Sequence, residues 1–500
     1  MVGNKLYKIN WDNYLSSERA RETNSTAGSG IDMRNSFESD LGRVIFCPAI
    51  RRMHDKTQVI PLSGGDTVLT RLTHSMQVMS VAESLASNYT RTKEFSELYG
   101  EKAIEYANSI SAIIRTASLL HDIGNPPFGH FGEVSIQDYF KKLKKDKHKF
   151  FKKLKRKEKL DYIQFDGNAM GLRLMSKLQY TGDLCGLNLT YATMAAYLKY
   201  PNIELANEDG YVGVHKHGVF QSEKELFDRI VDKCNMKRSD GTIKRHPLSF
   251  LVEAADSICY GVMDIEDGFT QHWYTYDHLT SKLSQLAYDK MTDKVKKSER
   301  VLNSMKNNEF SIETFLGCKR EHKDKTKMMD RRLILEFRVK LLSYLVKHTI
   351  DTFITNLSEI DSGTYNNELL DDDIYCINEA IGAFTKRYII SQPSVQTEEI
   401  KGQSVICGLL DKLIYYAFHT DKKYQAKVKG LLSEARLESA MHENIYKDEK
   451  YFDREQHSIA DFGIGQLNDY YKFRLIVDFV ACMTDKYSLF LYQKLRGISN

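Results

Sequence analysis

Residues 110–133 read ISAIIRTASLLHDIGNPPFGHFGE, and the rest of the chain can be interpreted outward from them. The first eleven residues of this stretch are mostly apolar and predict a buried helix. The helix ends in His121 and Asp122, and the sequence GNPP then breaks it. Ionisable side chains are rarely found in so apolar a setting unless they are paired or bind a metal ion. This pair is therefore a candidate metal site, whereas the second His-Asp pair, His54-Asp55, lies in a polar stretch.

The chain around this stretch is expected to be helical. Proline accounts for only 7 of 500 residues, which is below the usual ~5%, and proline is excluded from helix interiors. Apolar residues also recur at helical spacing, as in Val78, Val81 and Leu85. Alternating strand patterns are few, and a short β element is predicted only within residues 203–219. We therefore predict an all-α fold with at most a small β element.

The composition is that of an ordinary globular protein, with 42% hydrophobic and 28% charged residues. No apolar run approaches the ~20 residues that a membrane span needs. The first residues, MVGNKLYKINWDNYL, contain no apolar signal segment. Eight scattered cysteines without a CxxC pair argue against a disulfide framework and a structural zinc site. We expect a cytoplasmic protein with no membrane partner.

Three regions are expected along the chain. Residues 1–30 are rich in Ser, Thr, Gly and Asn, and they predict a loose N-terminal arm with one short helix. Residues 31–290 would form the core, and residues 291–500 would form a helical region packed on it. An acidic stretch at residues 368–373 is interpreted as a loop between helices.

A strongly basic segment follows the central stretch. Residues 141–159 carry twelve Lys and Arg against two acids, in a chain whose net charge is only +4. Such a run is either a solvated surface or a contact for a polyanion such as DNA, RNA or nucleotide phosphates. Leu143, Phe150, Phe151 and Leu154 interrupt it at a spacing that would hold one helix face against the body.

Other side chains that suit a metal site lie on apolar segments elsewhere. His74 stands at the head of an apolar helix, and Asp256 interrupts the apolar stretch 251–260. A divalent metal needs such imidazole and carboxylate ligands converging from different elements. Tyr260 and Asp264 follow Asp256 at i+4 and i+8 and would share one helix face. That stripe is unusual for packing alone, although each residue singly is also compatible with a satisfied polar group of the core.

The order of these residues resembles the H…HD…D arrangement of the HD phosphohydrolase superfamily. The stretch LLHDIGNPPFGHFGE, residues 119–133, is similar to the signature of one branch, the bacterial deoxynucleoside triphosphate triphosphohydrolases (dGTPases). Further blocks follow in the family's order, with the weakest match between about residues 275 and 395. They are IRRMHDKTQVIPL (50–62), RLTHS (71–75), FDGNAMGLR (165–173), LKY (198–200), EAADSICYGVMDIEDG (253–268) and VDFVACMTDKY (477–487), in which Cys482 replaces the family's glycine.

The resemblance implies an HD catalytic core with a helical C-terminal extension. The family's catalytic pair would be His130 and Glu133, whose i, i+3 spacing places a carboxylate beside an imidazole. One divalent ion, Mg²⁺, Mn²⁺ or Co²⁺, would be bound, since a mixed His and Asp set does not choose between these metals. Its ligands would be His74, His121, Asp122 and Asp256.

Substrate contacts also follow from the resemblance. Gln58 would pack under the ribose 3′-hydroxyl, Tyr260 would stack beneath the sugar where a 2′-hydroxyl would clash, and Asp264 would reach the 3′-hydroxyl. The KHGVF segment resembles the family's K-P-G-Y-Y, with His217 in place of proline. Phosphate contacts would come from Arg71, Asn168, Lys199, Tyr200 and Lys216.

The implied reaction is hydrolysis of a dNTP, with dGTP favoured, to deoxynucleoside and tripolyphosphate by attack at the α-phosphorus. The sequence leaves open whether His130 acts as acid or base. A homo-oligomer, commonly a hexamer, is implied, and some relatives respond to single-stranded DNA, which makes residues 141–159 a candidate effector site. Two alternatives remain: another HD phosphohydrolase, such as a nucleotide phosphodiesterase, and an HD regulator that binds nucleic acid without catalysis.

Overall fold

The computed structural model describes residues 6–21, 32–58, 69–179, 182–293, 305–306, 309–318, 327–370 and 375–498. Within these ranges the regular structure is helical, apart from one antiparallel hairpin, β1 (Met305–Lys306) with β2 (Glu309–Phe310). The prediction of an all-α protein is therefore confirmed. Short 3-10 turns and two π-helical turns join the helices. They are Trp11–Asn13, Met53–Asp55, Gly100–Lys102, Phe151–Lys153, Val212–Val214, Gln221–Glu223 and Ile464–Gln466, with the π turns Leu174–Leu178 and Lys386–Ile390.

The β element expected within residues 203–219 is wrong. This segment forms turns and the 3-10 turn Val212–Val214. The side-chain amide of Asn202 donates to the carbonyl of Lys216 over 3.0 Å, and the backbone N–H of Asn207 donates to the carbonyl of Val214 over 2.9 Å. These local bonds satisfy groups that a strand would have paired with a neighbour, so the segment needs no sheet.

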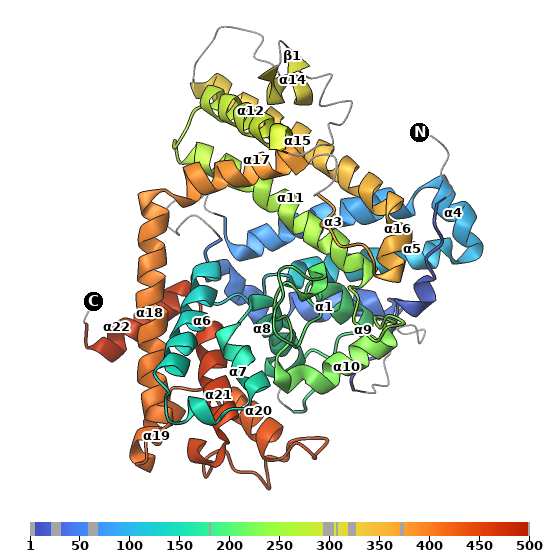
Figure 1. The fold of residues 1–500 in the computed structure, drawn as a ribbon. Helices are drawn as coiled ribbons and strands as arrows, with labels where there is room; N and C mark the ends of the chain where they lie inside the picture. The colour runs from blue at the N-terminus through green and yellow to red at the C-terminus, as the bar shows by residue number, and fades with distance from the viewer. Residues whose placement is uncertain are drawn as a thin grey trace.

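Three long helices make the centre of the molecule. The helix α3 (Arg71–Thr90) packs along α5 (Ala103–Leu120), and α11 (Pro247–Thr270) contacts both (Figure 1). Both α5 and α11 are largely buried, as expected for helices that are apolar on most sides. The remaining helices of this half are α1 (Ser36–Ile45), α2 (Pro48–Arg52), α4 (Lys93–Tyr99), α6 (Gly129–Lys145), α7 (Arg156–Ile163), α8 (Gly167–Arg173), α9 (Tyr191–Tyr197) and α10 (Lys224–Lys233).

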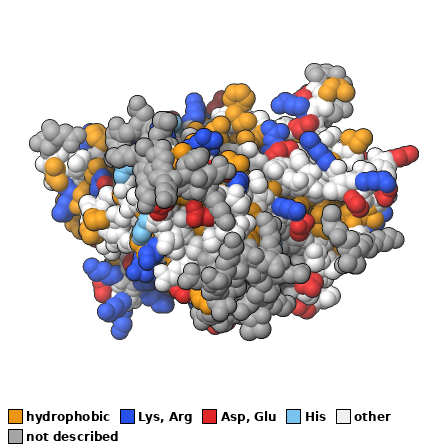
Figure 2. All heavy atoms as spheres, turned by 90° about the horizontal axis from the view of Figure 1, so that it is seen from above, with side chains coloured by type: hydrophobic (Ala, Val, Ile, Leu, Met, Phe, Trp, Pro, Cys, Tyr) orange, Lys and Arg blue, Asp and Glu red, His pale blue; other side chains and the backbone are white. Residues whose placement is uncertain are grey.

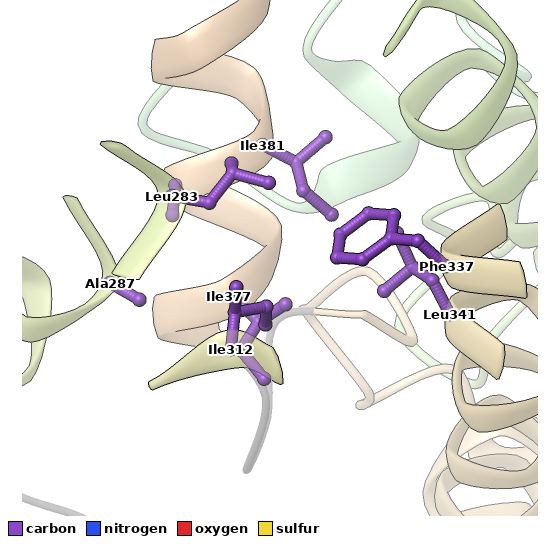
Figure 3. A pocket seen from close by; sticks show the side chains of 8 residues that line it. Leu283, Ala287, Ile312, Phe337, Leu341, Ile377 and Ile381 are labelled. Carbon is purple, nitrogen blue, oxygen red and sulfur yellow. The ribbon is translucent and has the colours of Figure 1, made fainter. Parts of the chain in front are cut away.

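The second half of the chain extends the molecule at both ends. In Figure 1, α12, α14, α15 and α17 lie at the top, and the long α18 runs down one side to α19, with α21 and α22 packed beside it. At the top, a pocket between α12, α14, α15 and α17 is lined only by apolar side chains, including Phe337 and Leu341, and has no room for a water molecule (Figure 3). It is a packed core. The bounds are α12 (Tyr276–Asp293), α14 (Ile312–Leu316), α15 (Lys327–Thr355), α16 (Leu357–Ser362), α17 (Tyr375–Thr385), α18 (Pro393–Ala417), α19 (Lys422–Lys429), α20 (Glu434–Asn444), α21 (Asp469–Ala481) and α22 (Asp485–Arg496).

A buried ion cluster joins the lower helices to the core. The guanidinium of Arg173, at the end of α8, bonds Asp478 at 2.7 Å, Glu223 at 2.9 Å and Glu443 at 2.9 Å. Asp478 also accepts from the Nε of Arg474 at 2.8 Å, and all five side chains are buried. Removing one partner from such a cluster would leave uncompensated charge in the interior.

The N-terminal region is not loose where the structure describes it. Ile9, Trp11 and Tyr14 are fully buried. The Tyr14 hydroxyl donates to a carboxylate oxygen of Asp361 over 2.6 Å. Residues 6–21 therefore pack against the body because they carry large apolar side chains among their polar ones. The division at residues 30 and 290 remains a prediction.

The surface is mixed in character. On the face in Figure 2, acidic, basic and hydrophobic side chains are interspersed, with Lys and Arg gathered at one edge. None of the described helices is long and apolar enough to cross a membrane. All eight cysteines are free thiols.

The basic segment is divided between the end of α6, a 3-10 turn and the start of α7. Phe151 and Leu154 are buried, Leu143 and Phe150 are partly buried, and most of its lysines are exposed. The apolar side chains thus hold it to the body as predicted. Of the acidic stretch 368–373, the last three residues lie outside the described part of the chain, and Leu369 and Leu370 form a turn.

Candidate active site

Three of the four predicted metal ligands converge between the central helices. His74 lies in the first turn of α3, which begins after the N-cap Thr70; His121 follows the last residue of α5; Asp256 lies midway along α11. The Nε2 of His74 is 3.0 Å from Oδ1 of Asp256, and the Nε2 of His121 is 3.4 Å from the same oxygen. One ligand atom from each of the three lies within 4.8 Å of the others.

Asp122 borders this group but is engaged differently. Its Oδ2 lies 3.5 Å from the Nε2 of His121, yet it also accepts from the Arg71 guanidinium over 2.6 Å. Its Oδ1 accepts from the side-chain amide of Asn125 over 2.6 Å. Binding a metal through Asp122 would therefore require an oxygen shared with Arg71 or Asn125, so the structure groups three predicted ligands closely and places the fourth beside them.

The donor set fits a divalent cation. The Nδ1 of His121 lies 2.7 Å from the carbonyl of Ser118, so that nitrogen carries the proton and Nε2 presents its lone pair to the cluster. This Nε2 is buried and has no hydrogen-bond partner in the part of the chain that the structure describes. A buried imidazole nitrogen facing a second imidazole and a carboxylate is the chemistry that Mg²⁺, Mn²⁺ or Co²⁺ accepts from mixed ligands.

The charges of the cluster also favour a cation. Burial lowers the pKa of His121, but the carboxylates of Asp122 and Asp256 outweigh it and raise that pKa to about 9. Burial would raise the pKa of Asp256, yet His121 and His74 hold it well below its usual value. The same negative charge that favours a proton on His121 favours a metal ion between these groups.

The predicted catalytic pair forms one hydrogen-bonded unit. The Nδ1 of His130 is 3.0 Å from Oε2 of Glu133, and the other oxygen of Glu133 accepts the backbone N–H of Gly167 over 2.6 Å. Glu133 is buried, whereas the His130 side chain is 69% exposed. The hydrogen bond to Glu133 raises the pKa of His130, with burial acting in the opposite direction. The buried carboxylate thus fixes the ring and leaves its second nitrogen accessible.

A tight turn brings Arg71 against the start of the catalytic helix. Phe128 and Gly129 both have positive φ, 61° and 57°. A Cβ on Gly129 would lie 2.2 Å from Nη2 of Arg71, so only glycine leaves room for this guanidinium. Arg71 therefore lies between the metal-ligand group, through Asp122, and the helix that carries His130 and Glu133.

The predicted phosphate-binding residues form a connected cationic group. The Lys216 ammonium is 3.4 Å from Asp166, and the side-chain amide of Asn168 donates to Asp166 over 2.7 Å. Lys199 pairs with the buried Glu253 at 3.2 Å, and the ammonium groups of Lys199 and Lys216 both lie near the Tyr200 ring, at 5.4 and 5.7 Å from its centroid. Two cations thus flank one aromatic ring.

The predicted sugar-binding residues lie in a buried, poorly solvated setting. On α11, burial raises the pKa of Tyr260 and raises that of Asp264 well above its usual range. One oxygen of Asp264 is buried without a hydrogen-bond partner. Gln58 stands at the edge of the described chain, before residues 59–68, and its Oε1 is buried and has no hydrogen-bond partner among the described residues. Unsatisfied buried oxygens of this kind are free to accept hydroxyl groups of a ligand.

Two residues that the sequence analysis left unassigned hold the site together. Asp485, the first residue of α22, accepts the backbone N–H of Thr57 over 2.8 Å and that of Phe128 over 3.0 Å. The buried Lys56 donates to the carbonyl of Asn125 and, over 3.3 Å, to that of Ala481. Asp485 was part of the quoted MTDKY block, but nothing in the sequence indicated which distant backbone it would hold.

Comparisons with known proteins define the class. The HD domain family matches residues 71–174, the segment that holds His74, His121, Asp122, His130 and Glu133. A deoxyguanosinetriphosphate triphosphohydrolase-like protein of Listeria innocua is 31% identical over 98% of this chain and the whole of that relative. A protein of the same name from Synechocystis is 30% identical over 93% of this chain and 94% of that relative. The deoxyguanosinetriphosphate triphosphohydrolase of Klebsiella pneumoniae is 30% identical over 98% of each.

The chain belongs to the deoxyguanosinetriphosphate triphosphohydrolase-like family of HD proteins. The resemblance noted from the sequence motifs is thereby confirmed along nearly the full length.

Proposed function

We propose that this protein is a metal-dependent hydrolase that converts a dNTP, with dGTP as its preferred substrate, to deoxynucleoside and inorganic tripolyphosphate. The observation that carries the proposal is that two units meet at Arg71. One is the His74, His121 and Asp256 group, in which His74 is buried and the other two are partly buried, and the other is the His130–Glu133 pair with an accessible ring nitrogen. Membership of the family supports the substrate class, since the relatives bear the name of that activity.

In this proposal His74, His121 and Asp256 hold the metal, with Asp122 as the neighbouring fourth group. When bound, a divalent ion at this place would polarise the α-phosphate and acidify a water. Arg71, Lys199 and Lys216 would bind the phosphate chain and offset the negative charge that repels a nucleophile. The basic groups are already oriented by carboxylates: Arg71 by Asp122, Lys199 by Glu253 and Lys216 by Asp166.

We propose that His130 is the general acid. Its hydrogen bond to Glu133 raises its pKa, which favours the protonated ring that an acid requires. The oxygen of water forms a bond to the α-phosphorus, the bond from phosphorus to the 5′-oxygen breaks, and His130 gives its proton to that leaving oxygen. The proton released by the water passes to solvent, and His130 is reprotonated before the next cycle.

Selectivity for deoxyribose would rest on the buried sugar site. Tyr260 would lie beneath the sugar and exclude a 2′-hydroxyl, while Asp264 and Gln58 would bind the 3′-hydroxyl. The unpartnered buried oxygens of Asp264 and Gln58 support this assignment. A homo-oligomer, a cytoplasmic location and a single-stranded DNA effector at residues 141–159 belong to the same proposal.

The test is incubation with each of the four dNTPs and Mn²⁺, followed by identification of the phosphate product. We expect tripolyphosphate with dGTP, and none from an Asp256→Ala protein purified in parallel. Pyrophosphate or single phosphate as the product would contradict the proposal and favour another HD phosphohydrolase reaction. Absence of turnover with every dNTP would favour the alternative of an HD regulator that binds nucleic acid without catalysis.

A further inference from the structure

A second pocket lies among the helices that hold the Gln58 segment in place. It has a volume of about 290 Å³ and lies between the end of α2 and the N-termini of α20 and α22. No Asp or Glu is found among the described residues that line it. Its polar lining consists of Arg52, Ser433, Arg436, Thr484 and Tyr487.

Neither arginine of this pocket pairs with a carboxylate of the residues that the structure describes. Arg52 is half-buried, and its side chain makes no hydrogen bond or ion pair within the described part of the chain. Arg436 donates from Nη1 to the Ser433 hydroxyl over 3.3 Å, but its Nε is buried and has no partner. Its guanidinium lies 5.5 Å from the centroid of the Phe479 ring, which forms an apolar wall. Partly buried guanidinium groups without carboxylate partners favour an anion.

The ends of two helices add positive potential to the pocket. Ser433 is the N-cap of α20, yet its side chain accepts no hydrogen bond from the first turn, so backbone N–H groups there lack a side-chain cap. Thr484 is the N-cap of α22 and accepts the N–H of Tyr487. Two acids adjoin lining residues along the chain: Asp485 is already bonded to Thr57 and Phe128, and Glu434, the first residue of α20, does not line the pocket. Helix N-termini attract anions, particularly when arginines stand beside them.

We propose that this pocket binds a phosphate group, either as inorganic phosphate or as the phosphate end of a small nucleotide. Its 290 Å³ is at the lower limit of small-molecule sites, roughly 300–1,000 Å³, which suits a mononucleotide or free phosphate but not a polynucleotide. An occupant between Arg52 and Arg436 would brace α2, which leads to Gln58, against α20 and α22. The binding does not depend on the proposed catalytic chemistry, since no residue of this pocket is assigned to it.

The test is calorimetric titration of the full-length protein with inorganic phosphate and, separately, with dGMP. We expect Arg52→Gln and Arg436→Gln each to weaken binding by about tenfold or more, because each removes a charge-assisted hydrogen bond. Arg51→Gln is the matched control, since Arg51 is exposed, precedes Arg52 on α2 and does not line the pocket. Arg71→Gln separates the active site from this pocket and should leave the pocket's binding intact.

The outcomes separate clearly. Binding that is lost in Arg52→Gln and Arg436→Gln but kept in Arg51→Gln and Arg71→Gln supports the proposal. If dGMP binds in this way and inorganic phosphate does not, the phosphate group belongs to a nucleotide. No binding to the wild type, or binding lost only in Arg71→Gln, overturns it. Hydrogen exchange gives an independent location: phosphate should slow exchange in residues 48–57 and 431–436 of the wild type but not of the Arg52→Gln protein.

Discussion

The molecule buries two clusters of ionisable side chains that differ in how their charges are satisfied. Around Arg173, the guanidinium bonds the carboxylates of Asp478, Glu223 and Glu443 at 2.7–2.9 Å. Around His121, a buried Nε2 has no partner and faces a carboxylate shared with His74. In the first cluster every carboxylate bonds a guanidinium, although Nη1 and Nη2 of Arg474 lack hydrogen-bond partners within the described residues. The second cluster instead leaves an imidazole lone pair that could bind a cation. Burial of charge alone therefore does not identify a functional site. What distinguishes the second cluster is that ligand atoms of His74, His121 and Asp256 face one another within 4.8 Å.

The largest effects should separate the two clusters. Asp256→Ala or His121→Ala should abolish metal binding and turnover while the fold survives, because the group has no other role than to hold the metal. Arg173→Met should instead lower the free energy of unfolding by about 3–5 kcal/mol, since the buried Glu223 and Glu443 lose their guanidinium partner and Asp478 keeps only Arg474. Metal titration, turnover and chemical denaturation of the three proteins make the comparison. An Asp256→Ala protein that regains full activity after chelation and re-metallation would remove the metal-site assignment.

His130→Ala should reduce turnover by ~10²-fold or more while nucleotide binding changes only a few-fold, because a general acid acts only in the transition state. Steady-state kinetics with dGTP and a separate binding measurement distinguish kcat from KM. Glu133→Gln is the companion variant: it should shift the high-pH limb of the rate profile to lower pH, since the hydrogen bond that raises the pKa of His130 is weakened. A raised KM with unchanged kcat in His130→Ala would make His130 a binding residue.

The Arg173 cluster should show its own pH dependence. Burial and the neighbouring Glu443 raise the pKa of Glu223 to about 7, with Arg173 acting against them, from an unfolded value of 4.5. Between these values the folded protein holds a proton that the unfolded chain has released, so stability falls as pH rises through this window. In Glu223→Gln, the free energy of unfolding should fall by about 1–3 kcal/mol less across this pH window than it does in the wild type. Urea unfolding of the wild type and of Glu223→Gln at pH 5 and pH 8 measures this difference. An equal change in the free energy of unfolding with pH in the two proteins would contradict the protonation of Glu223.

Tyr260→Ala should narrow the preference for dGTP over GTP, because the ring that excludes a 2′-hydroxyl is lost. Comparison of kcat/KM for the two nucleotides gives the ratio, and Gln58→Ala should weaken dGTP binding through the 3′-hydroxyl. An equal loss on both substrates in Tyr260→Ala would indicate a general packing role for this ring.

The smallest effect is expected from residues 141–159, whose lysines are mostly exposed. Changing several of them to glutamine should lower kcat/KM for dNTP without DNA if they attract the substrate. If they bind a polynucleotide, basal kinetics should hold and only a response to single-stranded DNA should disappear. If neither kcat/KM nor the response to single-stranded DNA changes, the segment is a solvated surface. Salt dependence alone does not decide, because both contacts are screened.

The sequence was sufficient to predict the helical fold class and the contacts between side chains that belong to one motif. Scarce proline and helical spacing predicted the fold, and the i, i+3 spacing of His130 and Glu133 predicted their hydrogen bond, found at 3.0 Å. A β element within residues 203–219 was predicted wrongly, because Asn202 and Asn207 satisfy that backbone locally.

Contacts between distant segments could not be predicted. The pairing of Asp122 with Arg71 depends on how α3 and α5 pack, and the Arg173 cluster joins residues that lie up to 305 positions apart. Spacing along a chain says nothing about such partners, because they are set by tertiary packing. The same holds for Arg52 and Arg436, which come from α2 and α20 and carry no shared motif.

The two hydrogen bonds that Asp485 accepts have a consequence for how the protein folds during its synthesis. Its partners Thr57 and Phe128 lie 428 and 357 residues earlier in the chain. Ribosomes add about 5–20 residues per second, so the segment before Gln58 and the turn before His130 wait many seconds for the carboxylate that fixes them. A nascent chain can form the paired helices α3 and α5 early, since they are close in sequence, but it should acquire ordered substrate binding only after Asp485 has left the ribosome. A chain whose synthesis stops before Asp485 should fold but should lack ordered substrate binding.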